Sequence, residues 1–241
     1  MATQGLWDIA MVLVWRIEAD YGHFSHPATN YSSLTYPVPP KTTVMGMLGA
    51  IMGVQDYLSF NAMRYAVVVE RLEGKRQFCF NGIKDALIEL DPSKERNGFR
   101  KGRKQFYREL LVSPHYRIYC DLSEVGKDVR DRLLFAMEDG RAYYPLYMGV
   151  NFCLASYSFL GIAEGCSIRY DDVMVDSMVP LDVDFELEDG KSYTDVRMAT
   201  RIANGREFGG FRDYLVETSG RSIRCRDVGV YEVEGSRVIW S

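Results

Sequence analysis

The sequence predicts an α+β protein whose first part has the β-α-β-β-α-β order of a ferredoxin-like (RRM-like) domain. Two segments with helical periodicity, residues 42–53 and 123–140, alternate with β-branched and aromatic segments that are typical of strands. The opening strand, residues 6–18, carries apolar side chains on both faces, so we expect it to be buried on both sides.

The last third of the chain predicts short hairpins. Turn signals such as Asn204–Gly205 and Glu234–Gly235 separate strand-like segments there. We therefore expect two parts, a ferredoxin-like domain over residues 1–165 and a β-hairpin-rich C-terminal part over residues 166–241.

Composition restricts the class of protein. The chain has 241 residues, of which 47% are hydrophobic, and a net charge of −4, all ordinary for a globular protein. No apolar run reaches the roughly 18–20 residues of a membrane span, and the first residues lack the basic region of a signal peptide, so we expect a cytoplasmic protein without a membrane partner. The five cysteines form no CxxC pair and the three histidines show no ligand spacing with them, so we expect reduced thiols and neither metal nor cofactor.

The first predicted helix carries three glycines on one side. It is expected to start at Thr42 or Thr43, with a threonine as its N-cap, and to present Gly46, Gly49 and Gly53 along one stripe. A glycine inside a helix costs about 1 kcal/mol relative to alanine. Two explanations stay open: close packing against another part of the protein, or a ligand such as RNA that approaches the flat face.

A basic segment interrupts the middle of the chain. Strands expected over residues 64–72 and 77–83 pair with each other, and residues 94–108 follow as a loop or hairpin tip with seven Lys/Arg and one Glu. Cations interleaved with rings such as Phe106 and Tyr107 suit single-stranded nucleic acid, because cations hold phosphates and rings stack on bases. A solvated hairpin has a similar composition.

Charge is also segregated near the C-terminus. Residues 171–189 hold eight acids and no base, whereas residues 197–226 contain seven arginines. This separation predicts a positive face on the protein, with phosphate as one partner.

Two histidines lie in an aromatic, turn-rich connection. His23 and His26 are flanked by Tyr21, Phe24 and Tyr36. Histidines could supply the acid and base of a metal-independent ribonuclease, but two histidines in such a loop more often only form hydrogen bonds.

The stretch LTYPVPPKTTVMGMLGAIMG (residues 34–53) resembles a family signature. With the loop before it, it is similar to the N-terminal motif YP-x-PP-(S/T)-x-x-x-G-x-L-x-x-x-x-G of the Cas-five (Cas5) family of CRISPR-associated RAMP proteins. Segments 103–122 and 144–159 are similar to the same family, so the resemblance covers most of residues 6–160. The matching motif residues are Tyr36, Pro37, Pro39, Pro40, Thr42, Thr43, Gly46, Leu48 and Gly53.

The resemblance implies a RAMP fold and a place in a type I Cascade surveillance complex, of a subtype I-B-like kind. Family members bind the 5′ handle of the guide RNA and contact the backbone and large subunits, in a position from which target DNA can be reached. The basic insert near residues 91–108 would be the thumb-like hairpin. One branch of the family cuts repeat RNA with a Tyr–Lys–His centre; Tyr36 stands at a comparable place, but no Lys–His pair stands at the matching positions.

We therefore expect a non-catalytic, guide-RNA-binding subunit in antiviral defence. The alternative is a metal-independent endoribonuclease that processes CRISPR repeat RNA with His23 or His26, Tyr36 and Lys41. The residues expected to bind RNA are Arg16, Tyr21, His23, Phe24, Tyr36, Lys41, Thr42, Thr43, Gly46, Arg100, Lys101, Arg103, Lys104 and Arg108.

Overall fold

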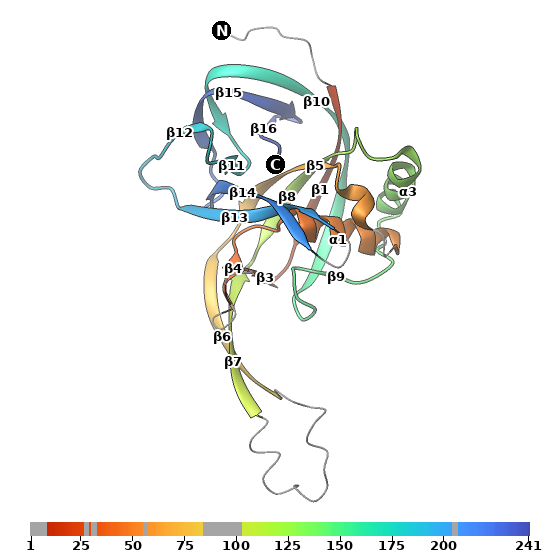
Figure 1. Ribbon diagram of the computed structural model, residues 1–241, viewed down its shortest axis with the longest axis vertical. Helices are drawn as coiled ribbons and strands as arrows, with labels where there is room; N and C mark the ends of the chain where they lie inside the picture. The colour runs from red at the N-terminus through yellow and green to blue at the C-terminus, as the bar shows by residue number, and fades with distance from the viewer. Residues whose placement is uncertain (1–8, 27–28, 30–32, 55–56, 84–102, 204–206) are drawn as a thin grey trace, which may run out of the picture.

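The computed structural model describes residues 9–26, 29, 33–54, 57–83, 103–203 and 207–241 (Figure 1). They form an α+β structure of mostly antiparallel strands, in which no helix is long and apolar enough to cross a membrane. The helices are α1 (Lys41–Met52), the 3₁₀ helix η1 (Tyr57–Phe60) and α3 (Lys127–Glu138). The strands are β1 (Ile9–Glu18), β2 (Tyr21–Gly22), β3 (Phe24–Ser25), β4 (Thr35–Tyr36), β5 (Arg64–Arg71), β6 (Gly74–Ile83), β7 (Arg103–Val112), β8 (His115–Asp121), β9 (Leu146–Tyr147), β10 (Leu154–Val175), β11 (Val179–Pro180), β12 (Asp184–Glu186), β13 (Tyr193–Ile202), β14 (Phe208–Glu217), β15 (Ile223–Val233) and β16 (Ser236–Val238).

Strand β1 lies inside the main sheet, whose order is β12-β15-β10-β1-β8-β5. It pairs antiparallel with β10 on one side and with β8 on the other. Leu13 and Trp15 are fully buried on one face, and Val12 and Val14 are fully buried on the other. The expected burial of this strand on both faces is therefore confirmed.

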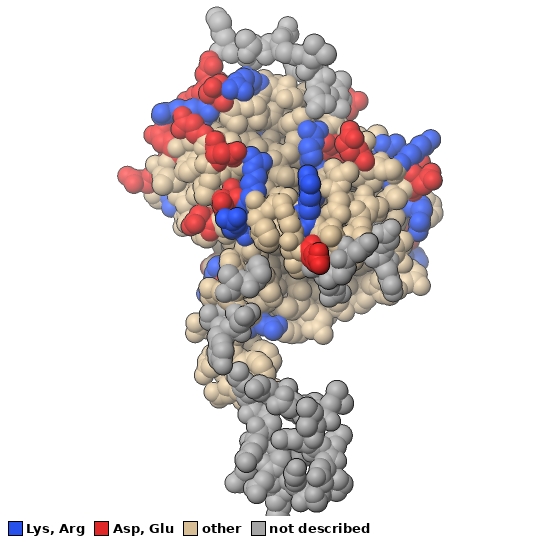
Figure 2. Space-filling model, viewed as in Figure 1, with Lys and Arg blue, Asp and Glu red and all other residues tan. Residues whose placement is uncertain are grey.

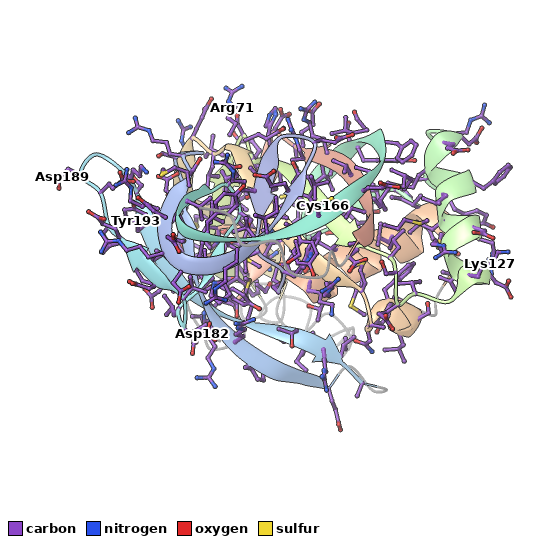
Figure 3. All side chains as sticks on the ribbon, turned by 90° about the horizontal axis from the view of Figure 1, so that it is seen from above. Arg71, Lys127, Cys166, Asp182, Asp189 and Tyr193 are labelled. Atoms are coloured by element: carbon purple, nitrogen blue, oxygen red, sulfur yellow. The ribbon has the colours of Figure 1, made fainter. Side chains whose placement is uncertain are left out.

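The two α-helices cover one face of this sheet. Figure 1 shows α1 and α3 together on one side, and Figure 3 shows Lys127 of α3 far from Asp182 and Asp189 in the β-rich part. Met45, Leu48 and Ile51 of α1 join the larger hydrophobic core, which also receives side chains of β13 and β14. The second part of the chain thus helps to bury the first helix.

The other face of the sheet is covered by the end of the chain. Val233, Val238 and Trp240 pack against Val12 and Val14 of β1. The last residue, Ser241, donates its backbone N–H to the carbonyl oxygen of Tyr65 in β5 at 3.0 Å. The sheet therefore curls until its β5 edge meets the C-terminus.

The arginine-rich segment does not form one uniformly positive face, because several of its arginines pair with the acidic segment. Arg226 of β15 contacts Glu186 of β12 at 2.6 Å, and Arg212 of β14 contacts Asp182 at 2.9 Å. Figure 2 accordingly shows Lys and Arg side chains with Asp and Glu among them. Long-range strand pairing determines these partners, so charge runs along the sequence could not show them.

Residues 103–108, the described end of the basic insert, lie in a long hairpin of β6 and β7 that projects from the body (Figure 1). The expected pairing of 77–83 with 64–72 is wrong: β6 pairs with β7 from Gly74↔Val112 to Ile83↔Arg103, and β5 pairs with β8. Ser113, at φ 48°, and Pro114 separate β7 from β8 and redirect the chain into the sheet. The connecting residues 84–102 lie outside the described ones.

Two expected helix boundaries differ. Helix α1 begins at Lys41 after Pro40, without a side-chain cap, so neither Thr42 nor Thr43 is the N-cap. Helix α3 begins at Lys127, after Gly126, and not at residue 123, whose hydroxyl donates to Asp121 at 2.6 Å. The position of the expected division between residues 165 and 166 falls inside β10.

Gly149 holds the segment before β10 against the loop that contains His23. It has φ 88°, and an added Cβ would lie 2.0 Å from the carbonyl oxygen of His23. We expect Gly149→Ala to lower the free energy of unfolding by about 2–4 kcal/mol, from the left-handed backbone and the clash together. Thermal unfolding measures the loss.

Gly229→Ala is the control, because an added Cβ there meets nothing within 4 Å. Equal melting temperatures for the two variants would contradict the packing described here.

Candidate nucleic-acid interface

A groove of about 430 Å³ runs along the first turns of α1. Its floor is the helix, and its walls come from the segment around β9 and from the ends of β13 and β14. The residues that line it are Thr42, Thr43, Gly46, Met47, Ala50, Tyr57, Pro145, Leu146, Tyr147, Gly149, Ile202 and Phe208. Three expected RNA-binding residues, Thr42, Thr43 and Gly46, are thus brought together.

The helix start under this groove carries uncompensated positive charge. No side chain caps α1, and its first turn contains no acidic residue. Lys41 is only 6% exposed and donates from Nζ to the carbonyl oxygen of Asn61 at 2.9 Å, with no ion pair to a carboxylate among the described residues. Burial, and then the Arg201 guanidinium, lower the pKa of Lys41 to about 8. Such a helix terminus favours an anion.

Asn61 joins this helix start to the second part of the chain. Its amide Nδ2 donates to the carbonyl oxygen of Ile202 at 2.8 Å, and the Ile202 backbone N–H donates to Asn61 Oδ1 at 3.2 Å. Because Lys41 donates to the carbonyl of the same asparagine, β13 is held beside the helix start.

The three glycines of α1 have different surroundings. An added Cβ at Gly49 would lie 3.2 Å from the carbonyl oxygen of Val54, and at Gly53, with φ 70°, only 2.5 Å from the ring of Tyr143. Close packing therefore explains these two. Gly46 is exposed, and an added Cβ there would meet nothing within 4 Å. Packing against the described residues does not explain Gly46.

Strands β13 and β14 add exposed rings and cations beside the groove. Phe208 is 53% exposed and Phe211 46% exposed, with the Arg197 guanidinium 5.9 Å from the Phe211 ring centre. Arg201 is exposed and acts electrostatically on Lys41. None of these was expected as a site residue; the only signal was the arginine-rich composition of residues 197–226.

Most of the expected aromatic loop is buried. His23 is 0% exposed; its Nδ1 lies 2.8 Å from the carbonyl oxygen of Glu109, and its Nε2 3.1 Å from the hydroxyls of Ser25 and Ser33. Burial lowers the pKa of this histidine. His23 therefore connects the loop to the projecting hairpin.

Two rings of this loop also belong to the core. Phe24 is 2% exposed and Tyr36 4% exposed, and the Tyr36 hydroxyl donates to the carbonyl oxygen of Arg197 at 2.6 Å. The ring of His26 lies against Tyr36 with centres 4.6 Å apart. Neither Phe24 nor Tyr36 offers an open face to a base, whereas Tyr21, at 44% exposed, does.

Arg16 lies on the opposite face of the sheet from α1. It follows the alternation of Val12 and Val14, whose side chains pack on that face. Its Nη2 donates to Glu70 at 3.0 Å, and Arg117 donates from Nε to the same carboxylate at 2.7 Å. The structure therefore separates Arg16 from the groove.

The projecting hairpin carries a row of phenylalanines on one face. Phe80 stacks with Phe106 at 5.5 Å and with Phe78 at 6.1 Å, and the Arg108 guanidinium lies 5.8 Å from the Phe80 ring centre and 5.5 Å from that of Phe152. Of the other expected cations, Arg103 and Lys104 begin β7, whereas Arg100 and Lys101 lie outside the described residues.

Within the described residues, no group of three or more His, Cys, Asp or Glu side chains could hold a metal ion. The groove is lined by the threonines Thr42 and Thr43 and by rings such as the exposed Phe208, and the ammonium of Lys41 is buried beside it. These groups bind phosphates and bases.

Comparisons with known proteins agree with the motif. The model of a family described as CRISPR-associated protein (Cas_Cas5) matches residues 12–170. A solved CRISPR RNA-guided surveillance complex contains a chain 13% identical to this one, with a TM-score of 0.52 and coverage of 88% of this chain and 90% of that chain, which shows a shared fold. A CRISPR protein from Archaeoglobus fulgidus is 11% identical, with a TM-score of 0.49 and coverage of 95% and 97%. No curated protein matches the chain. Because the family model spans more than half of its length, this chain belongs to the Cas5 family of CRISPR-associated proteins.

Proposed function

We propose that this chain is a non-catalytic subunit of a type I, subtype I-B-like CRISPR Cascade surveillance complex and binds the 5′ handle of the guide RNA. The observation that carries the proposal is the start of α1, which has no side-chain cap, includes the buried Lys41 and lies beside an open groove. A site with positive charge, hydroxyls and flanking rings suits a single RNA strand. Membership of the Cas5 family supports the same role.

The architecture supports a RAMP-type ferredoxin-like domain in this proposal. The elements β1, α1, β5, β8, α3 and β10 follow in chain order, and their strands lie in the sheet order β10-β1-β8-β5 with antiparallel neighbours. Counted in chain order, the first of these four strands pairs with the fourth and the third, and the second pairs with the third, as in a split βαβ unit. The β-rich C-terminal part of the proposed division, residues 166–241, supplies the wall of the groove.

The RNA backbone would lie across Lys41, Thr42 and Thr43 and cross the exposed Gly46. Arg201 and Phe208 would face it from β13 and β14, with a base against the Phe208 ring. Tyr21 and Arg108 remain candidates for contacts at the hairpin, whereas the burial of His23, Phe24 and Tyr36 favours a supporting role for them.

The hairpin of β6 and β7 would act as the thumb and contact the neighbouring backbone subunit. Its phenylalanine row and the basic residues Arg100, Lys101, Arg103 and Lys104 suit such a contact or the adjoining RNA. A large subunit and target DNA would complete the assembly, which would work in the cytoplasm.

The binding role is favoured over the endoribonuclease alternative. Both ring nitrogens of His23 are engaged, and the Tyr36 hydroxyl is bonded to the carbonyl oxygen of Arg197. A general acid or base must reach the substrate proton that it transfers. Native and denaturing gels of end-labelled repeat RNA in EDTA test both roles: a shifted but intact RNA supports the proposal, and a single metal-independent cut overturns it.

Gly46→Ala is expected to stabilise the protein and weaken RNA binding. Alanine in a helix interior is favoured by about 1 kcal/mol over glycine, and the added methyl group meets no atom of the described residues within 4 Å. The same methyl group occupies the floor of the groove, so we expect at least a tenfold loss of affinity, measured by fluorescence anisotropy with a labelled 5′-handle RNA.

The control is Gly126→Ala, before α3, where an added Cβ also meets nothing within 4 Å. It should leave affinity unchanged. If Gly46→Ala bound the RNA with unchanged affinity, the RNA would not pass over the floor of the groove at Gly46.

Binding is expected to weaken as the pH rises through 8. The charged fraction of Lys41 falls from about 0.9 at pH 7 to about 0.1 at pH 9 when its pKa is about 8. If the ammonium holds a phosphate, affinity falls about tenfold for each pH unit above 8. A bound phosphate raises the pKa of Lys41, so the midpoint of this fall in affinity moves to a higher pH. Lys41→Met should bind weakly with no such dependence, and Lys41→Arg should keep its affinity at pH 9.

The stability of the free protein should change in the opposite sense. A lysine whose folded pKa is lower than its unfolded value opposes folding while charged. For Lys41 the cost in folding free energy is fully present below pH 8 and decreases as the pH rises toward 10.5. Lys41→Met should therefore unfold at a higher temperature than the wild type at pH 7, and a lower one would show that the ammonium stabilises the fold.

A further inference from the structure

The first half of β10 forms an open edge of the main sheet. Residues 156–165 pair on one side with β1, from Glu18↔Ser156 to Ala10↔Gly165. On the other side, β15 pairs with β10 only from Cys166 onward, and β9 pairs only with Leu154 and Ala155. Within the described part of the chain, no strand pairs with the outer side of these ten residues.

The opposite edge of the same sheet is closed by the chain itself. Met178 donates its backbone N–H to the carbonyl oxygen of Val67 in β5 at 3.2 Å, and Ser241 donates to Tyr65 at 3.0 Å. Among the described residues, the chain thus bonds to backbone groups of β5 at this edge and leaves the outer side of residues 156–165 in β10 unpaired.

The open edge also lacks the side chains that usually protect an edge strand against pairing. Natural edge strands are short or carry lysine, proline or inward-pointing charges. The segment SYSFLGIAEG (residues 156–165) contains neither lysine, arginine nor proline, and its one charged residue is Glu164. Leu160 and Ile162 are each 39% exposed.

We infer that this edge receives an extended segment of another protein subunit, which adds a strand to the sheet beside β10. The inference rests on the proposed function, because it requires that the chain works inside an assembly. A polypeptide strand matches both the N–H donors and the C=O acceptors of the edge. RNA phosphates only accept hydrogen bonds, and the edge offers them no cation.

A bulge makes pairing with a second copy of this chain unfavourable. The register with β1 shifts between Val14 and Trp15, which leaves Leu160 as the extra residue, and Gly161 has φ 143°. This irregularity lies at the middle of residues 156–165, where a two-fold axis between antiparallel copies would lie. It leaves short regular stretches that suit a partner segment of about four or five residues.

Hydrogen–deuterium exchange at residue resolution tests the inference on two samples, the purified chain and the chain within the co-expressed ribonucleoprotein complex. Amides of residues 156–165 that point away from β1 should exchange rapidly in the free chain and at least tenfold more slowly in the complex. Equal protection in both samples would mean that the chain covers its own edge, and equal exposure in both would mean that nothing covers it. Either result overturns the inference.

A matched pair of variants supplies the second test. Ile162→Lys places a charge on the edge strand, and Met11→Lys places one at a side chain of similar exposure, 37%, on the inner strand β1. Both should bind 5′-handle RNA like the wild type, but only Ile162→Lys should enter the complex at least fivefold less in pull-down. Equal incorporation, or a dimer of the wild-type chain that Ile162→Lys dissociates, would overturn the inference. If the wild-type chain does not bind 5′-handle RNA, that result would instead refute the proposed function.

Discussion

The fold depends on one strand that is buried from both sides. β1 lies between β10 and β8, with Trp15 and Leu13 under the helices and Val12 and Val14 under the C-terminus. Because both of its faces must be covered, the chain needs a helix layer on one side and a curled β-sheet on the other. Strands β13 and β14 pack on the helix side, in the same core as α1, and their contact with α1 creates the groove.

The sequence predicted what local periodicity determines. The double-sided burial of β1, the positions of two helices to within a few residues and the change to hairpins after them all follow from patterns of 2 or 3.6 residues. The pairing of β6 could not be predicted in this way, because its partner β7 lies beyond residues 84–102 and the nearer strand β5 looked equally suitable. The charge pattern was misleading for the same reason: Arg226 and Glu186 are neighbours only through the register of β12 and β15.

The candidate site was predictable in part. Thr42, Thr43 and Gly46 belong to a motif, and they do line the groove. Arg16, five residues before Tyr21, was expected beside them, but the alternation of β1 points it to the far face of the sheet. Phe208 and Arg201 were missed because they come from a hairpin about 160 residues away in sequence, held beside α1 by the amide of Asn61. The buried His23 and Tyr36 show that polar aromatic loops can be part of a core when each polar atom has a partner.

Photo-crosslinking of a 5′-handle RNA that carries 4-thiouridine, followed by mass spectrometry of the crosslinked peptides, tests most directly whether RNA lies across the start of α1. If the guide RNA lies there, crosslinks will concentrate in the peptides that contain residues 41–50, 143–149 and 200–211. Crosslinks confined to the opposite face, in the peptides that contain Arg16, Glu70 and Arg117, would contradict the proposed path and place the RNA on the other side of the sheet.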